Sequence, residues 1–118
     1  MRLEAKKYLF DIQKAADHLA EFTSGQTLET YVANALLRSA VERQFEIIGE
    51  ALTQLRKLDP ETSARVTDAS RIIAFRNILI HGYADVDDRL VWNIVETKLP
   101  TLIGEVAKLL APTDARAQ

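Results

Sequence analysis

Residues 28–58 read LETYVANALLRSAVERQFEIIGEALTQLRKL, and apolar side chains recur along this stretch every three or four positions. This period is typical of an amphipathic helix, whereas a half-buried strand would alternate every second residue. Thr27 is a good N-cap, and Asp59-Pro60 would end the helix. At 1.5 Å per residue such a helix is about 45 Å long, more than a small domain needs to span its core. We therefore predict one unbroken helix that contacts a second subunit over part of its length.

The sequence that precedes and follows this stretch has the same helical period. Residues 3–23 predict a first helix, which Ser24-Gly25 ends with Gly25 in the left-handed conformation. Residues 60–63 predict a turn or a single helical turn. Four Gly and three Pro are few for a chain of this length, and this scarcity also favours long helices.

Two further helices are expected in the C-terminal half. The third helix would end at His81-Gly82, with Gly82 as the residue just beyond it, and the last would kink or split at Pro100. The expected N-caps are Thr67 or Asp68 for the third helix and Asp85 or Asp87 for the last. Residues 1–110 are thus predicted as one all-α domain, a bundle of four or five helices, followed by a flexible tail at 111–118.

The composition is that of an ordinary globular domain. The chain has 118 residues, 17 acidic and 15 basic side chains, and 47% apolar residues. These values argue against wholesale disorder, and no apolar run approaches the roughly 18 residues of a membrane span. Zero Cys and two His argue against disulfides, a thiol nucleophile and a metal site. We predict no cofactor, no membrane association and, without a recognisable signal peptide, a cytoplasmic location.

Residues 76–83 read RNILIHGY and bring together side chains that can handle phosphate and protons. Arg76 offers a planar fork of donors that suits phosphate oxygens, and Asn77 can orient a phosphate or a hydroxyl. His81 can give and take protons because imidazole has a pKa of about 6.5. Tyr83 adds a hydroxyl just past the helix end. This set suffices to cleave RNA without a metal, with His81 moving a proton and Arg76 stabilising charge on the phosphate.

Structural roles are the alternative for the same residues. His81 can be a stabilising cation at a helix C-terminus, and Arg76 can form a surface ion pair of small value. His18 lies on the charged side of the first helix and is predicted to be only solvated. An arginine five residues before a histidine is a weak motif, so the spacing alone leaves both interpretations open.

The long predicted helix has a second unusual feature near its middle. Glu42, Glu46 and Glu50 are four residues apart and form an acidic stripe, which is mildly destabilising on an isolated helix. Gly49 costs about 1 kcal/mol relative to Ala in such a position. Close approach of another helix would explain this glycine and adds to the expectation that the long helix lies in a dimer interface. The alternative is an ordinary solvated face with a glycine of no consequence.

Together these stretches resemble a known family. ERQFEIIGEAL, followed some 25 residues later by ASRIIAFRNILIHGY, is similar to the HepT-like branch of the HEPN superfamily. The resemblance extends from the first helix to VWNIVETKLPTLIGEV. The family signature Arg-x4-His-x-Tyr is matched by Arg76, His81 and Tyr83, and the Asn that often accompanies it is Asn77.

The resemblance implies an all-α homodimer of the HEPN type and a metal-independent endoribonuclease that is the toxin of a type VII-like toxin–antitoxin pair. It implies catalytic roles for Arg76 and His81 and a supporting phosphate contact from Asn77. The implied antitoxin is an MntA-like minimal nucleotidyltransferase, which adds AMP units to the motif tyrosine. In this sequence that residue is Tyr83.

Helical geometry predicts that such a site is composite. At about 100° per residue, Asn77 and His81 lie about 40° apart around their helix, whereas Arg76 and His81 lie about 140° apart. One chain therefore does not readily direct both groups at one phosphate. Two chains related by a two-fold axis near this helix would bring both arginines and both histidines around one cleft.

A different class of function also fits the sequence. The protein can be a non-catalytic helical dimer that binds a nucleotidyltransferase partner or a nucleotide, with the Arg/His motif serving nucleotide contacts or structure. The net charge of −2 favours this alternative, because nucleic-acid binders usually carry a basic surface. Cleavage of RNA by the purified protein separates the two hypotheses.

Overall fold

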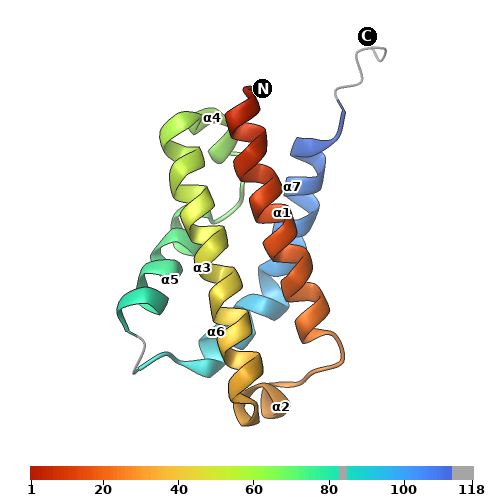
Figure 1. Cartoon of the computed structure of the whole chain (residues 1–118), viewed down its shortest axis with the longest axis vertical. Helices are drawn as coiled ribbons and strands as arrows, with labels where there is room; N and C mark the ends of the chain where they lie inside the picture. Colours follow the sequence, from red (N-terminus) through yellow and green to blue (C-terminus); the bar gives the residue numbers. More distant parts are fainter. Residues whose placement is uncertain (83–84, 113–118) are drawn as a thin grey trace.

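The computed structural model describes residues 1–82 and 85–112, and this part of the chain is all helix and connecting loops, without a strand. The helices are α1 (Leu3–Thr23), α2 (Leu28–Ala33), α3 (Ala35–Leu58), α4 (Pro60–Ser63), α5 (Ala69–His81), α6 (Asp88–Thr97) and α7 (Leu99–Leu110). Helices α2 and α4 are short, with six and four residues. The predicted all-α class is confirmed (Figure 1).

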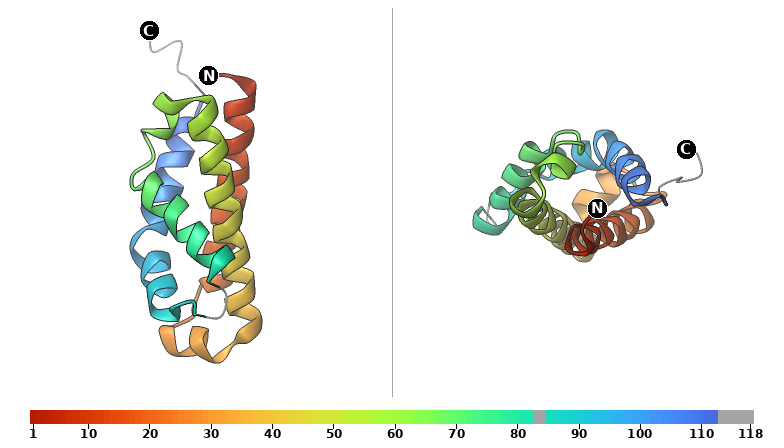
Figure 2. Two further views of the ribbon diagram at one scale, coloured as in Figure 1. Left: turned by 90° about the vertical axis from the view of Figure 1, so that its left-hand side faces the viewer. Right: turned by 90° about the horizontal axis from the view of Figure 1, so that it is seen from above.

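The helices form an elongated bundle of 51 × 29 × 18 Å. Helices α1 and α3 run side by side in opposite directions, α7 packs against α1, and α5 runs obliquely against α3 (Figures 1 and 2). The apolar stripes of these helices meet in one core, in which Leu9, Ile48 and Leu52 are completely buried. Each buried side chain of this size stabilises the fold by about 1.5–3 kcal/mol.

The prediction of one unbroken helix from Leu28 to Leu58 is wrong, because Asn34 interrupts the helix and divides it into α2 and α3. This residue has extended backbone angles (φ −119°, ψ 98°), and its side-chain oxygen accepts a hydrogen bond of 3.0 Å from the Leu37 amide. Asparagine competes with the helical backbone in this way and serves as the N-cap of α3. The break also lets α2 bury Tyr31 fully, with its ring 5.3 Å from that of Trp92.

Other helix ends agree with the sequence. Gly25 has a φ of +76° after α1, and Thr27 caps α2 with a reciprocal pair of hydrogen bonds to Thr30. Asp87 caps α6 by accepting from two backbone amides. Pro100 lies in the first turn of α7, where its missing N–H costs nothing, and the predicted last helix is split there into α6 and α7.

Helix α5 begins after Asp68 and ends before Gly82, as predicted, but neither end has the expected cap geometry. Asp68 precedes the helix with a φ of +59° and makes no capping bond, because its carboxylate accepts from Lys98 Nζ at 2.8 Å. This hydrogen bond holds the pKa of Asp68 below its usual range. Gly82 follows the helix with a φ of −110° and is therefore not left-handed. It is favoured for another reason: a Cβ there would lie 2.9 Å from the Ile78 carbonyl oxygen.

Helix α7 ends at Leu110, and only Ala111 and Pro112 of the predicted tail fall within the described chain. The flexibility expected for residues 113–118 concerns a part outside it. None of the helices at positions 1–82 and 85–112 combines the length and the apolar character that crossing a membrane requires.

Candidate functional site

Helix α5 carries three of the four predicted site residues. Its buried side is apolar, and Phe75 from this side meets Phe45 of α3 edge-on at a ring distance of 5.2 Å. The residues of the motif occupy other positions around the helix: Arg76 is partly buried, whereas Asn77 and His81 are exposed. Tyr83, the fourth predicted residue, lies outside the described residues.

Arg76 is fixed against α3. Its side chain retains only 15% of its exposure, and Nη2 lies 2.9 Å from Glu50 Oε1. The same nitrogen donates to Thr53 Oγ1 at 3.2 Å. The Nε–H is buried and has no hydrogen-bond partner among the described residues. The sequence singles out Arg76 and places Glu50 in an acidic stripe, but it does not indicate that Glu50 and Thr53 hold this arginine.

Gly49 makes this placement possible. A Cβ at position 49 would lie 2.3 Å from Arg76 Cβ and 2.6 Å from its Cγ, closer than side chains can approach. The prediction of a close approach at Gly49 is therefore confirmed. The approaching element is α5 of the same chain, so this glycine does not by itself indicate a second subunit.

Asn77 and His81 are exposed, in contrast to Arg76. His81 is the last residue of α5, next to the negative end of the helix dipole. Arg76 packs against α3, and an ideal helix places His81 about 140° away from it around the axis. The two side chains therefore start from different sides of α5 within one chain.

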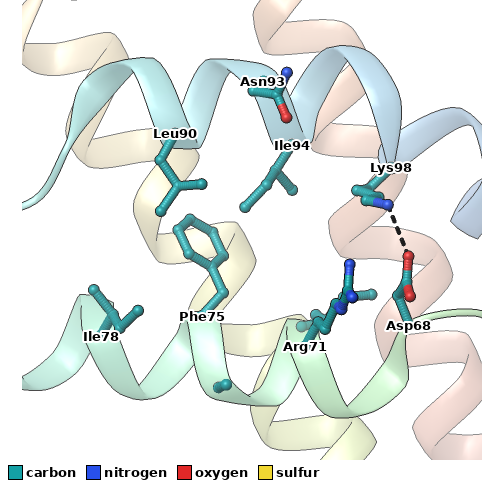
Figure 3. Close-up of a pocket in the computed structure, with 10 residues that line it drawn as sticks. Asp68, Arg71, Phe75, Ile78, Leu90, Asn93, Ile94 and Lys98 are labelled. Carbon is teal, nitrogen blue, oxygen red and sulfur yellow. Dashed lines mark hydrogen bonds and ion pairs between the residues drawn. The ribbon is translucent and has the colours of Figure 1, made fainter.

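An apolar groove of about 350 Å³ lies between α5 and α6. In Figure 3, Phe75 points from α5 toward Leu90 and Ile94 of α6, and the Asp68–Lys98 ion pair closes one end. Ile78 and Leu90, which line this groove, retain 49% and 41% of their exposure. The groove was not predicted from the sequence, because its two walls come from separate helices.

The three glutamates of the acidic stripe have different surroundings. Glu50 binds Arg76, and Glu46 lies 3.4 Å from Arg43 of the same helix. The pKa of Glu42 is raised, chiefly by burial and then by the nearby carboxylates of Asp88 and Glu46. The stripe is therefore more than a uniformly solvated face.

His18 differs from its prediction. It is partly buried, its Nδ1 lies 3.4 Å from Gln44 Oε1, and its ring stacks on Phe22 at 5.6 Å. At this point α1 lies close enough to α3 for Gln44 to contact the imidazole, which is therefore partly shielded from solvent. His18 is a structural residue between α1 and α3 and is not merely solvated.

The sequence model of the family described as "Ribonuclease HepT-like" matches residues 12–109, which is most of the chain. The chain belongs to the HepT-like ribonuclease family. The resemblance seen in the sequence is confirmed, and within the HEPN superfamily the all-helical fold is the expected one.

Curated relatives of the HepT-like chain agree with this assignment. It is 35% identical over 103 residues to a "Putative RNase" of Methanocaldococcus jannaschii, covering 87% of this chain and 94% of the relative. It is 34% identical over 113 residues to the "Probable ribonuclease HepT" of Thermococcus cleftensis, covering 92% and 98%. A "Putative RNase" of Caldanaerobacter subterraneus is 32% identical over 105 residues, covering 89% and 93%. No solved structure gives a significant match.

Membership of the HepT-like family confirms the predicted enzyme class, that of ribonucleases, at the level of the family. The roles of Arg76, Asn77, His81 and Tyr83 stay predictions, as do the dimer and the antitoxin. The structure adds the contact of Arg76 with α3, which a motif on α5 alone does not reveal.

Proposed function

We propose that the protein is a metal-independent endoribonuclease and the toxin of a toxin–antitoxin pair. The observation that carries this proposal is the arrangement on α5: Arg76 is fixed by α3, and Asn77 and His81 are exposed on the last turns. The relatives named as ribonucleases support the same activity.

The proposed chemistry divides among the three side chains. His81 moves the proton of the ribose 2′-OH or of the leaving oxygen, and Arg76 stabilises negative charge that develops on the phosphate. Asn77, one turn before His81, contributes a phosphate contact. Because Arg76 and His81 face different sides of α5, the complete site takes groups from two chains.

The site therefore requires a homodimer with α5 near its two-fold axis. The two features that placed the long helix in the interface, its length and Gly49, have explanations within one chain. The dimer proposal now rests on α5 and α6, where the exposed side chains of Ile78 and Leu90 line one apolar groove next to Asn77. An isologous contact over this groove would bring the two copies of His81 toward each other.

We expect the protein to sediment at micromolar concentration as a dimer, with twice the 13.3 kDa mass of one chain. Ile78→Asp places a charge in the apolar groove and should shift the equilibrium to monomer, because burying an unpaired carboxylate is strongly unfavourable. Leu3→Asp is the matched control, since Leu3 is 81% exposed at the first position of α1, which starts beside the N-terminus (Figure 1). A wild-type monomer, or equal effects of the two variants, would contradict the proposed dimer.

The proposed antitoxin is a minimal nucleotidyltransferase that transfers AMP to Tyr83. Tyr83 follows His81 by two residues, so an attached AMP can reach the site. Its phosphate would pair with Arg76 and compete with the phosphate of RNA. Tyr31 is unsuitable as an acceptor because it is fully buried, and burial, followed by Glu42 and Asp88, raises the pKa of its phenol.

Co-expression with the cognate nucleotidyltransferase should add whole AMP units to the protein, as measured by intact-mass spectrometry. Tyr83→Phe should remove these additions and leave a toxin that the partner no longer neutralises by modification. Tyr8→Phe is the control, because Tyr8 is partly exposed on α1 and should not affect labelling. Unmodified wild-type protein, or AMP on Tyr8, would exclude Tyr83 as the acceptor.

The non-catalytic alternative retains one supporting observation. The charge of Arg76 is already paired with Glu50, which suits a structural arginine as well as a catalytic one. In that case the dimer binds a nucleotidyltransferase or a nucleotide and leaves RNA intact. An assay of RNA cleavage with purified protein decides between the two functions.

A further inference from the structure

We propose that Glu50 is a positioning residue for RNA cleavage, which together with Thr53 fixes the orientation of the Arg76 guanidinium. This inference rests on the proposed ribonuclease function. It adds two residues of α3 to a site that the motif places entirely on α5.

The α3 side of this contact is built for one arginine. Gly49, Glu50 and Thr53 share the surface of α3 that faces α5, and all three meet Arg76. Thr53 Oγ1 donates its own proton to the Gly49 carbonyl at 2.8 Å, so a lone pair remains to accept from Arg76. The hydroxyl is therefore oriented before the arginine binds it.

The carboxylate of Glu50 is held at both oxygens. Oε1 lies 2.9 Å from Arg76 Nη2, and Oε2 accepts from Gln54 Nε2 at 2.9 Å. A glutamate fixed in this way restricts the planar guanidinium to few orientations. Glu50 remains 56% exposed, so its charge also acts on anything that approaches Arg76 from solvent.

Stability alone does not account for this arrangement. An ion pair with one exposed partner contributes little to folding, commonly about 0–1 kcal/mol. The buried Nε–H without a partner costs a comparable or larger amount, about 1–3 kcal/mol. Departures from good local structure of this kind are expected at functional sites. We infer that the contact with α3 holds Arg76 in the position that the reaction requires.

Glu50 should then have two opposite effects on the reaction. By fixing the guanidinium it favours the geometry in which charge on the phosphate is stabilised, which raises kcat. By neutralising part of the charge of Arg76 it weakens the binding of RNA, which raises KM. Glu50→Gln should therefore lower kcat by about fivefold and lower KM as well, whereas Glu50→Ala, without any acceptor, should lower kcat further.

The kinetic test compares these variants and Thr53→Val with the wild-type protein on one RNA substrate. Glu46→Gln is the matched control, because it makes the same change one turn earlier, in a residue paired with Arg43. The inference predicts the joint fall of kcat and KM in Glu50→Gln and wild-type constants in Glu46→Gln. Unchanged kcat in Glu50→Ala, or the same change in both glutamine variants, would overturn it.

A second measurement does not depend on activity. In protein with ¹⁵N-labelled arginine, the buried Nε–H of Arg76 should give a separate resonance, assigned by its loss in Arg76→Lys. Glu50→Ala should move this resonance toward the position of free arginine, and Glu46→Gln should leave it in place. A resonance unaffected by Glu50→Ala would overturn the inference. Wild-type protein that cleaves no RNA, yet shows the shift, would instead overturn the proposed function and leave Glu50 as the residue that fixes Arg76.

Discussion

Replacing Arg76 or His81 with alanine is expected to lower RNA cleavage by at least about 100-fold. General acid–base catalysis by a positioned side chain contributes about 10²–10⁴-fold, and one charge-stabilising group contributes about 10²–10³-fold. Each variant removes one of these contributions at the scissile phosphate. The measurement is the rate of cleavage by purified protein, together with the loss of growth inhibition when the variant is expressed.

Both variants should remain folded. His81 is exposed at the end of α5, and Arg76 contributes a contact of small net stability. Circular dichroism should show matched helical content. Arg76→Lys adds a graded test, because lysine keeps the charge but not the planar fork, and should recover only part of the activity.

The chain offers a control for each substitution. Arg71→Ala removes an exposed arginine from the same helix, and His18→Ala removes the other histidine, which stacks on Phe22. Neither should lower cleavage by more than about twofold once folding is matched. Full activity in Arg76→Ala or His81→Ala would show that the catalytic assignment is wrong.

Most of the fold follows from local signals in the sequence. The period of apolar residues predicts the helices, and capping chemistry at Gly25, Thr27 and Pro100 predicts where several of them end. The break at Asn34 was missed although asparagine is a preferred N-cap. The residues on both sides of Asn34 have the apolar period of a continuous helix. The interaction that favours the break is the burial of Tyr31 against Trp92, a tertiary contact that the local sequence does not reveal.

The candidate site was predicted only in part, for a similar reason. Arg76, Asn77 and His81 could be named because they lie together in the sequence. The partners of Arg76 could not, because they depend on the register between α3 and α5, helices separated by α4 and its loops. Gly49 signalled a close approach, but one glycine does not reveal which helix approaches or that an arginine occupies the space.

The role of Gly49 leads to the second large expected effect. Alanine normally stabilises a mid-helix position by about 1 kcal/mol relative to glycine. At position 49 the added Cβ would overlap the Cβ and Cγ of Arg76, so we expect Gly49→Ala to destabilise the fold by about 1–3 kcal/mol. Because a misplacement of about 1 Å can cost on the order of 100-fold in rate, RNA cleavage should fall steeply as well.

Gly104 in α7 is the matched control. A Cβ there would meet no heavy atom within 4 Å in the described chain, so Gly104→Ala should stabilise by about 0.5–1 kcal/mol. Both free energies come from urea unfolding followed by circular dichroism at one protein concentration, since the stability of a dimer depends on concentration.

Combining two substitutions locates the cause of the effect. Arg76→Gly removes the Cβ and Cγ that the methyl group added at position 49 would meet, so in that background Gly49→Ala should become neutral or stabilising, like Gly104→Ala. The change of sign is expected only if the clash with Arg76 produces the loss, because a general intolerance of α3 to alanine would persist in both backgrounds. If Gly49→Ala instead stabilises the wild-type protein as much as Gly104→Ala does, then α3 and α5 do not approach as closely as they do in the structure. The site would then lack the support that fixes its arginine.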